Sequence, residues 1–220
     1  ERTLEEADEL IRTFNAMLLI ARLDAGAAEQ SLTEFDLADM VAGLAELYEP
    51  VAEEAGLGLT VSAEGPLSIR ANRALISQAL ANLVDNAIKY SARGDRPEVP
   101  DPARAVTIRL ARAESGATLE IGDRGPGIPP ADRDRALRRF VRLEASRSRP
   151  GTGLGLSLVA AVVRMHGGRI GLDDNAPGLK VTVWLPVPQP GTTGPEVVPF
   201  GPASGEVIRV GREQDGRDAG

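Results

Sequence analysis

The chain has 220 residues, 42% of them hydrophobic and 26% charged, and a formal net charge of −7. It has no cysteine and one histidine, which excludes a disulfide framework, a thiolate metal site and a multi-histidine zinc site. The acidic balance argues against nucleic acid as the main partner, and no apolar run approaches the roughly 18 residues of a membrane span.

Residues 1–26 have apolar side chains at heptad-like spacing, among them Leu10, Phe14 and Met17. This spacing favours a helix in a coiled coil or bundle over an amphipathic helix lying on its own domain. The first residue is Glu1 rather than Met, and no signal-peptide pattern follows. We therefore expect a fragment of a longer protein, with residues 1–30 as a partial helical domain.

Residues 31–186 alternate between helical and extended patterns, and we expect them to form one domain. Asp36 is a candidate N-cap for the first of three helices. The segment from Ala92 to Ala103 is rich in Pro, Gly and charge, which predicts a surface loop. The expected helices are 37–55, 73–90 and 156–165, and the expected strands are 57–61, 67–70, 106–110, 119–121, 169–172 and 179–185.

These patterns predict an α/β (α+β) two-layer sandwich, with a mixed, mostly antiparallel sheet and helices on one face, preceded by the bundle or coiled-coil helix. A doubly wound nucleotide fold is not expected, because no GxGxxG follows the first strand and no GxxxxGK[ST] occurs. Residues 187–220 contain seven Gly and five Pro, a composition typical of a disordered tail.

The first polar cluster is Asn82-Leu83-Val84-Asp85-Asn86-Ala87-Ile88-Lys89-Tyr90. Asn82, Asn86, Lys89 and Tyr90 fall at i, i+4, i+7 and i+8, so they share a helix face opposite the apolar stripe. Amide oxygens can ligate Mg²⁺, and a lysine can neutralise phosphate. The alternative is a polar helix surface that happens to carry two asparagines.

Two glycine-rich loops follow. In Asp123-Arg124-Gly125-Pro126-Gly127-Ile128, a carboxylate ends a strand and glycines permit close approach to a flat ligand. In Gly151-Thr152-Gly153-Leu154-Gly155-Leu156, glycines open a helix whose first N–H groups form an anion site. Taken alone, the first loop reads as a plain turn and the second as a flexible hinge.

Together and in this order, the three clusters resemble the N, G1 and G2 boxes of the ATP-binding catalytic domain of sensor histidine kinases, in the GHKL ATPase superfamily. Phe140-Val141-Arg142-Leu143 is similar to the F box, although Leu137 stands where that box often begins with Phe. His166-Gly167-Gly168 resembles another family element. The resemblance covers about residues 35–186, and the preceding helix is similar to the end of the dimerisation and phosphotransfer domain.

The resemblance implies ATP and Mg²⁺ as cofactors, with Asn82 and Asn86 at the metal and Lys89 as a third catalytic residue that contacts phosphate. Asp123 would bind the adenine amino group, and Arg142 or Arg147 would reach the γ-phosphate. The other residues expected to bind the nucleotide are Tyr90, Gly125, Gly127, Ile128, Gly151, Thr152, Gly153, Leu154, Gly155 and Leu156.

The resemblance also implies transfer of the γ-phosphoryl group to a histidine and then to an aspartate of a response regulator. It implies a homodimer through the N-terminal helix and a cytoplasmic location, with a membrane anchor in the full protein left open. His166 follows a helix and precedes two glycines, so we expect it to contact the last helical carbonyls rather than accept phosphate. The chain alone should then not phosphorylate itself.

Two alternatives within the same fold stay open. One is an ATP-binding regulatory module or an anti-sigma-type serine kinase. The other is a mechanochemical ATPase, although no residue can be assigned as a general base for water.

Overall fold

A five-stranded sheet forms one layer of the domain. The structure, a computed structural model, describes residues 32–92, 101–141 and 153–187, and residues 14, 17–19 and 21 of a preceding helix. The parallel pair β2–β4 and three antiparallel pairs confirm the mixed, mostly antiparallel sheet. In spatial order the strands are β2 (Leu57–Ala63), β4 (Asp101–Ala113), β5 (Gly116–Gly122), β7 (Leu179–Pro186) and β6 (Arg169–Asp174).

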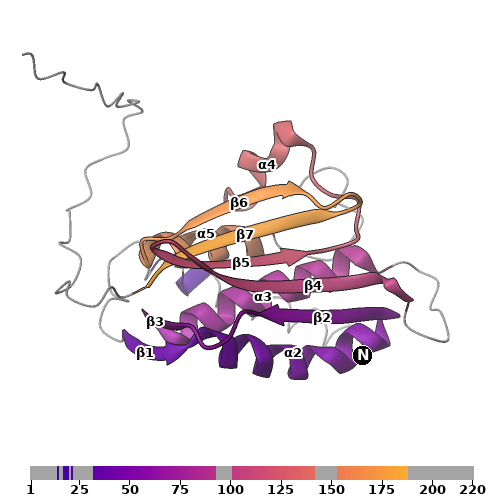
Figure 1. The fold of residues 1–220 in the computed structure, drawn as a ribbon. Coiled ribbons are helices and arrows are strands. Elements are labelled where there is room, and N and C mark those ends of the chain that lie inside the picture. The colour runs from indigo at the N-terminus through magenta and orange to yellow at the C-terminus, as the bar shows by residue number, and fades with distance from the viewer. Residues whose placement is uncertain are drawn as a thin grey trace, which may run out of the picture. The chain divides into compact units, whose positions relative to one another are not determined.

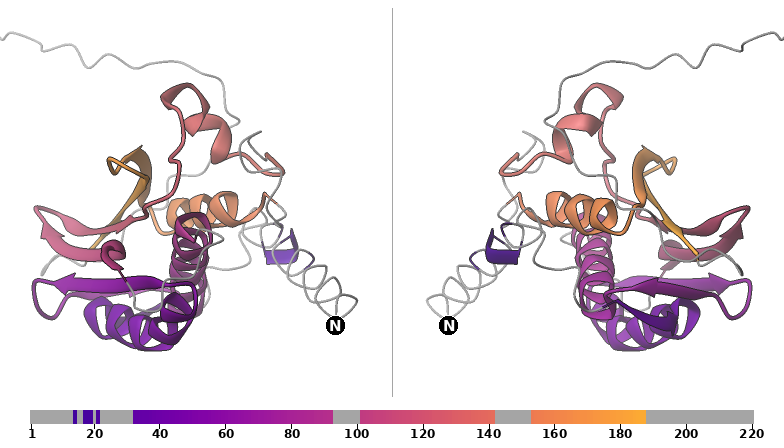
Figure 2. Two further views of the ribbon diagram at one scale, coloured as in Figure 1. Left: turned by 90° about the vertical axis from the view of Figure 1, so that its right-hand side faces the viewer. Right: turned by 90° about the vertical axis from the view of Figure 1, so that its left-hand side faces the viewer.

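Three helices cover one face of this sheet and form the second layer (Figures 1 and 2). They are α2 (Leu37–Glu54), α3 (Arg73–Ser91) and α5 (Gly155–Met165). The inward side chains of the strands alternate with outward ones, as in β7, where Val181, Val183 and Leu185 are buried. The predicted two-layer sandwich is therefore confirmed.

Three local differences from the sequence prediction concern segments whose partners lie far away in the chain. β1 (Thr33–Asp36) was not expected, and it forms a separate two-stranded sheet with β3 (Ser68–Ala71). The short helix α4 (Pro130–Ala136) lies in a stretch for which no helix was expected. β4 begins at Asp101, inside the predicted loop, because β2 offers it a partner as far as Leu57.

Side-chain caps fix the starts of α2 and α3. The Asp36 carboxylate accepts hydrogen bonds from the N–H groups of Ala38 at 2.8 Å and Leu67 at 3.0 Å, confirming it as an N-cap. The Leu67 bond, with weaker help from Ala38, holds the pKa of Asp36 below its ordinary value. The Asn72 side chain accepts from the Leu75 N–H at 3.1 Å and caps α3.

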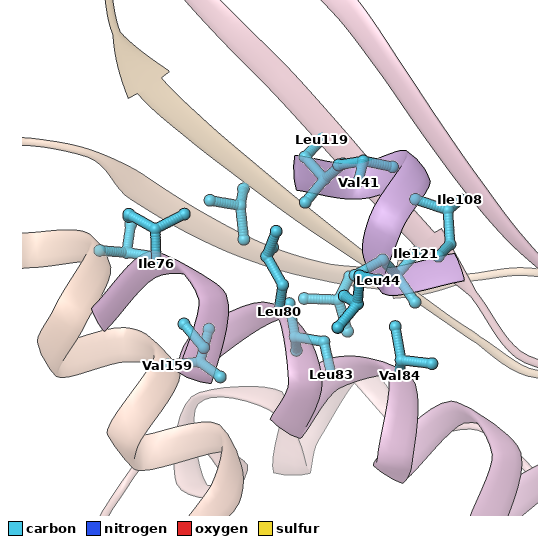
Figure 3. Close-up of a cluster of buried hydrophobic side chains, with 14 of the residues drawn as sticks. Val41, Leu44, Ile76, Leu80, Leu83, Val84, Ile108, Leu119, Ile121 and Val159 are labelled. Carbon is cyan, nitrogen blue, oxygen red and sulfur yellow. The ribbon is translucent and has the colours of Figure 1, made fainter. Parts of the chain in front are cut away.

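Helix α3 lies at the centre of the hydrophobic core (Figure 3). Its buried side chains contact both other helices and the sheet, so displacing α3 would disturb the whole core. Labelled in Figure 3 are Ile76, Leu80, Leu83 and Val84 of α3, Val41 and Leu44 of α2, Val159 of α5, and Ile108, Leu119 and Ile121 of the sheet.

The stripe of apolar side chains at helical spacing on α2 is only partly buried. Met40, Val41 and Leu44 lie in the core, whereas Leu47 is 68% and Val51 46% exposed. At 100° per residue, Leu47 falls at one edge of the stripe and Ala52 at the opposite edge. Val51 falls between Met40 and Leu44, so its exposure reflects what packs beside the last turn and not its angular position on the helix.

The ends of the chain lie mostly outside the described residues. Residues 14, 17–19 and 21 are helical, as predicted, and Phe14, Met17 and Leu18 are exposed. The predicted bundle and the predicted disordered tail at residues 187–220, of which the structure describes only Val187, stay predictions. No helix in the described part of the chain has the length and apolar character needed to cross a membrane.

A matched pair of leucines tests this account of the core. Leu80→Ala should lower the free energy of unfolding by about 3 kcal/mol, because it leaves a cavity at a side chain that is 3% exposed. Leu47→Ala, at the exposed flank of α2, should change it by less than about 0.5 kcal/mol. Urea unfolding followed by circular dichroism measures both, and equal losses would contradict the assigned packing.

Candidate functional site

Two asparagines lie one turn apart on the face of α3 that points away from the core. Asn82 and Asn86 are both half-buried. The Asn82 side-chain amide donates from Nδ2 to the Gln78 carbonyl at 2.9 Å. Because this bond uses the amide nitrogen, it leaves Oδ1 of Asn82 directed at the start of α5.

Gly155, the first residue of α5, lies directly against these asparagines. A Cβ atom at this position would lie 3.1 Å from Nδ2 of Asn86 and 3.5 Å from Oδ1 of Asn82. A side chain here would therefore crowd Asn86, whose amide would have to shift by a few tenths of an ångström. The structure thus brings together the first and third clusters predicted from the sequence.

The start of α5 is held by buried contacts of its own. Leu154 is 1% exposed, and its carbonyl accepts from the Ser157 hydroxyl at 2.9 Å and the Leu158 N–H at 2.8 Å. Gly153 has φ +72°, a left-handed conformation that glycine adopts without strain. Leu156 is half-buried against the core. The first N–H groups of α5, which have no partner within the helix, are consequently placed beside the asparagines.

Asp123 follows β5 and is only 6% exposed. Its Oδ1 atom accepts from the N–H groups of Gly125 at 2.8 Å and Leu179 at 2.9 Å. Burial raises the pKa of the Asp123 carboxyl, and these two bonds oppose the rise. Among the described residues no hydrogen bond engages Oδ2, so that oxygen can accept from a ligand.

The turn between β6 and β7 supports Asp123, and the sequence reasoning did not select its residues. The Asn175 side chain donates to the Asp123 carbonyl at 2.8 Å. Gly178 has φ +114°, and a Cβ there would collide with the Asp123 backbone. Pro177-Gly178 marks a turn in the sequence, but only the fold places that turn against Asp123.

The C-terminal end of α3 meets the Asp123 loop. A Cβ atom at Gly125 would lie 2.7 Å from the Tyr90 carbonyl oxygen. The Ser91 hydroxyl, also not selected from the sequence, accepts from the Arg124 N–H at 2.8 Å. Lys89 and Tyr90 are half-buried beside this junction, with the ammonium 5.7 Å from the ring centroid. All three clusters therefore lie along α3.

Beyond Gly125 the loop leads to α4. Gly127 has φ +71° and lies close to the Gly178 carbonyl. The Ile128 carbonyl accepts from Nε of Arg133 at 3.2 Å, and the same guanidinium pairs with Asp174 at 2.9 Å. The loop is thus tied to β6. The predicted phosphate contacts of Arg142 or Arg147, Gly151 and Thr152 lie outside the described residues.

His166 follows the last turn of α5 and has hydrogen bonds at both ring nitrogens. Nδ1 lies 2.8 Å from the Val162 carbonyl, and Nε2 accepts from the Asn72 N–H at 2.9 Å. Because a carbonyl only accepts and a backbone N–H only donates, the ring carries its proton on Nδ1 and is neutral. Burial lowers the pKa of His166, and the Val162 bond partly opposes this. The predicted contact with the last helical carbonyls is confirmed.

Known proteins are similar to this chain in sequence. Residues 71–189 match the family described as "Histidine kinase-, DNA gyrase B-, and HSP90-like ATPase". The sensor protein IrlS of Burkholderia pseudomallei is 34% identical over 190 residues, which cover 86% of this chain and 38% of IrlS. The sensor-like histidine kinase SenX3 of Mycobacterium tuberculosis is 32% identical over 86% of this chain and 44% of its own.

Solved structures of sensor histidine kinases have a fold similar to that of this chain. Full-length ShkA in complex with AMPPNP has a TM-score of 0.70 at 28% identity, over 83% of this chain and 37% of ShkA. The mycobacterial sensor histidine kinase MprB has a TM-score of 0.59 at 30% identity, over 71% of this chain and 97% of that structure. The chain spans less than half the length of IrlS and of SenX3.

The neutral state of His166 predicts a pH effect on stability. With its pKa lowered from 6.5 in the folded state, the unfolded chain binds the proton more tightly. The contribution of His166 is therefore present above about pH 6.5 and is lost as the pH falls through the lower folded pKa. We expect the free energy of unfolding to fall between about pH 7.5 and 5.5.

His166→Gln should flatten this slope, because the chain has no other histidine. Urea unfolding at several pH values measures both proteins. An identical slope for the two would show that His166 does not titrate in this way.

Proposed function

The chain belongs to the family of histidine kinase-, DNA gyrase B- and HSP90-like ATPases, and we propose that it is the ATP-binding kinase domain of a two-component sensor histidine kinase. In this proposal it transfers the γ-phosphoryl group of ATP to a histidine other than His166, for relay to an aspartate of a response regulator. One observation carries the proposal: α3 joins the Asn82, Asn86 and Gly155 contact in its middle to the loop of buried Asp123 at its C-terminal end.

The Asp123 end fits the adenine base. The exocyclic amino group of adenine is a donor, and Oδ2 of Asp123 is a charged acceptor of matching polarity. The two backbone bonds to Oδ1 orient the carboxylate, so no rearrangement is needed to present Oδ2. Gly125, Gly127 and Ile128 would border the base, since the glycines leave room for a flat ring.

The Asn82 and Asn86 end fits a magnesium-bound triphosphate. The N–H groups of Gly155 and Leu156 open α5, and the positive end of the helix dipole favours phosphate. Oδ1 of Asn82 is directed to the same place, and amide oxygens suit a hard cation such as Mg²⁺. The ion would neutralise charge on the phosphates, and Lys89 would add a positive charge beside them.

Several finer assignments belong to the proposal without contacts in the described residues. Arg142, Gly151 and Thr152 would complete the phosphate site around Gly153 and Leu154. The full-length protein would dimerise through the helix of residues 1–30, with the catalytic domain at 31–186 and a tail at 187–220. A cytoplasmic location with an optional membrane anchor remains part of the same proposal.

His166 is not the phosphoacceptor in this proposal. Nucleophilic attack needs a ring nitrogen with an available lone pair, and Nε2 is already bonded to the Asn72 N–H while Nδ1 carries the proton. The chain should consequently bind ATP without labelling itself. The names of the relatives favour this kinase over a purely regulatory ATP-binding module or a serine kinase.

Asn86→Ala tests the magnesium end. It should weaken Mg²⁺-dependent binding of AMPPNP by about 10- to 100-fold, the cost of losing a bond to a charged group, with little change in folding. Gln78→Ala is the matched control, because its exposed side chain lies one turn before Asn82 and its carbonyl is retained. Titration calorimetry with and without Mg²⁺ measures both variants, and unchanged Asn86→Ala affinity would exclude the metal role.

Asp123→Asn tests the adenine end with the least change in shape. The asparagine oxygen can still accept from Gly125 and Leu179, but its amide nitrogen would face the adenine amino group, donor against donor. ATP affinity should fall by about tenfold or more, and the preference for ATP over GTP should decrease. Competition binding with the two nucleotides checks this, and an unchanged preference would remove the adenine assignment.

A further inference from the structure

We propose that His166 is a positioning residue for the phosphate end of this site, fixing α5 along α3 so that Gly155 meets Asn82 and Asn86. The proposal rests on the proposed function, because it concerns how the nucleotide site is held in shape. His166 itself lies at the opposite end of α5, so it acts through the helix and not by contact with the nucleotide.

The C-terminal contact joins the ends of two helices. The ring bridges the Val162 carbonyl in the last turn of α5 and the N–H of Asn72, the residue that caps α3. Both bonds are short, at 2.8 and 2.9 Å, and both are directional, so they define where α5 ends relative to where α3 begins.

The two glycines after His166 help to fix the C-terminal end of α5. Gly167 has φ +68°, the left-handed conformation that commonly ends a helix. A Cβ at Gly168 would lie 2.9 Å from Cγ1 of Val163 and would collide with the Trp184 carbonyl. The segment after α5 therefore lies directly on β7, and the helix end is fixed against the sheet as well as against α3.

The second contact lies about 16 Å away along the helix axis, the length of an 11-residue helix. There Gly155 leaves little room beside Asn86, so a small displacement of α5 toward α3 would clash and one away would open the contact. A helix transmits axial displacement as a nearly rigid body. Loss of the His166 bridge would therefore displace Gly155 relative to Asn82 and Asn86.

The adenine end should not share this effect. Asp123 is held by Gly125, Leu179 and Asn175, to which His166 makes no hydrogen bond among the described residues. A positioning role consequently predicts a selective loss of affinity for phosphate groups, whereas general destabilisation would weaken all ligands alike.

The experiment compares the affinities of Mg²⁺-AMPPNP and of adenosine for the intact chain and its variants. His166→Ala should weaken AMPPNP binding about fivefold, as expected for one lost hydrogen bond, and change adenosine binding by less than about twofold. His166→Gln should recover most of the AMPPNP affinity, because its amide oxygen can accept from the Asn72 N–H. Arg164→Ala, exposed in the last turn of α5, is the control and should bind as the parent does.

Three results would count against the proposal in distinguishable ways. Unchanged AMPPNP affinity in His166→Ala, or equal losses for AMPPNP and adenosine, would overturn the positioning role. A parent chain that binds neither ligand would overturn the proposed function itself.

If His166→Ala does not fold, a spectroscopic measurement on the parent chain tests the His166 bridge instead. The chain has a single histidine, so long-range ¹H–¹⁵N correlation spectra report its tautomer without ambiguity. The proton should reside on Nδ1 at neutral pH, and a proton on Nε2 would overturn the bridge to Asn72.

Discussion

The close approach of Gly155 to Asn82 and Asn86 is the constraint on which the site depends. It joins the start of one helix to the middle of another, and the absence of a side chain at Gly155 leaves room for both asparagine amides beside the helix start. Two kinds of polar group thereby reach one place: amide oxygens suited to a cation, and unpaired helix N–H groups suited to an anion. The magnesium-bound phosphate of the proposed function combines both charges and would use both kinds of group.

Helix α3 couples this contact to the stability of the domain. Its apolar face forms the centre of the core, and its polar face carries Asn82, Asn86 and Lys89. Its N-terminus is bound to His166 and its C-terminus to the Arg124 backbone through Ser91. The same burial that stabilises the fold therefore holds the site residues in place before any ligand binds, which lowers the entropic cost of binding.

Electrostatic attraction at the proposed site is short-range. A chain of net charge −7 repels a nucleotide at long range, so in the proposed function attraction would come from neighbouring groups: Lys89, the first N–H groups of α5 and a bound cation. Backbone N–H groups favour opposite charge states at Asp123 and at His166. Backbone N–H groups favour the charged carboxylate of Asp123 against its burial, while burial and a backbone N–H keep the His166 ring neutral.

The sequence by itself determined the order of the main helices and strands, the two-layer architecture, the Asp36 cap and the residues of the three clusters, because these depend on local periodicity and on residue types at fixed spacing. It also indicated that His166 contacts the end of its own helix. Only the tertiary structure decided which distant backbones meet: β1 with β3, the Asn175–Gly178 turn with Asp123, Gly155 with Asn86, and His166 with Asn72. It also decided that Leu47 and Val51 are exposed, since the burial of an apolar helix position depends on what packs beside it. Such contacts join residues with no regular spacing in the chain, and their geometry is set by how the helices and the sheet pack together.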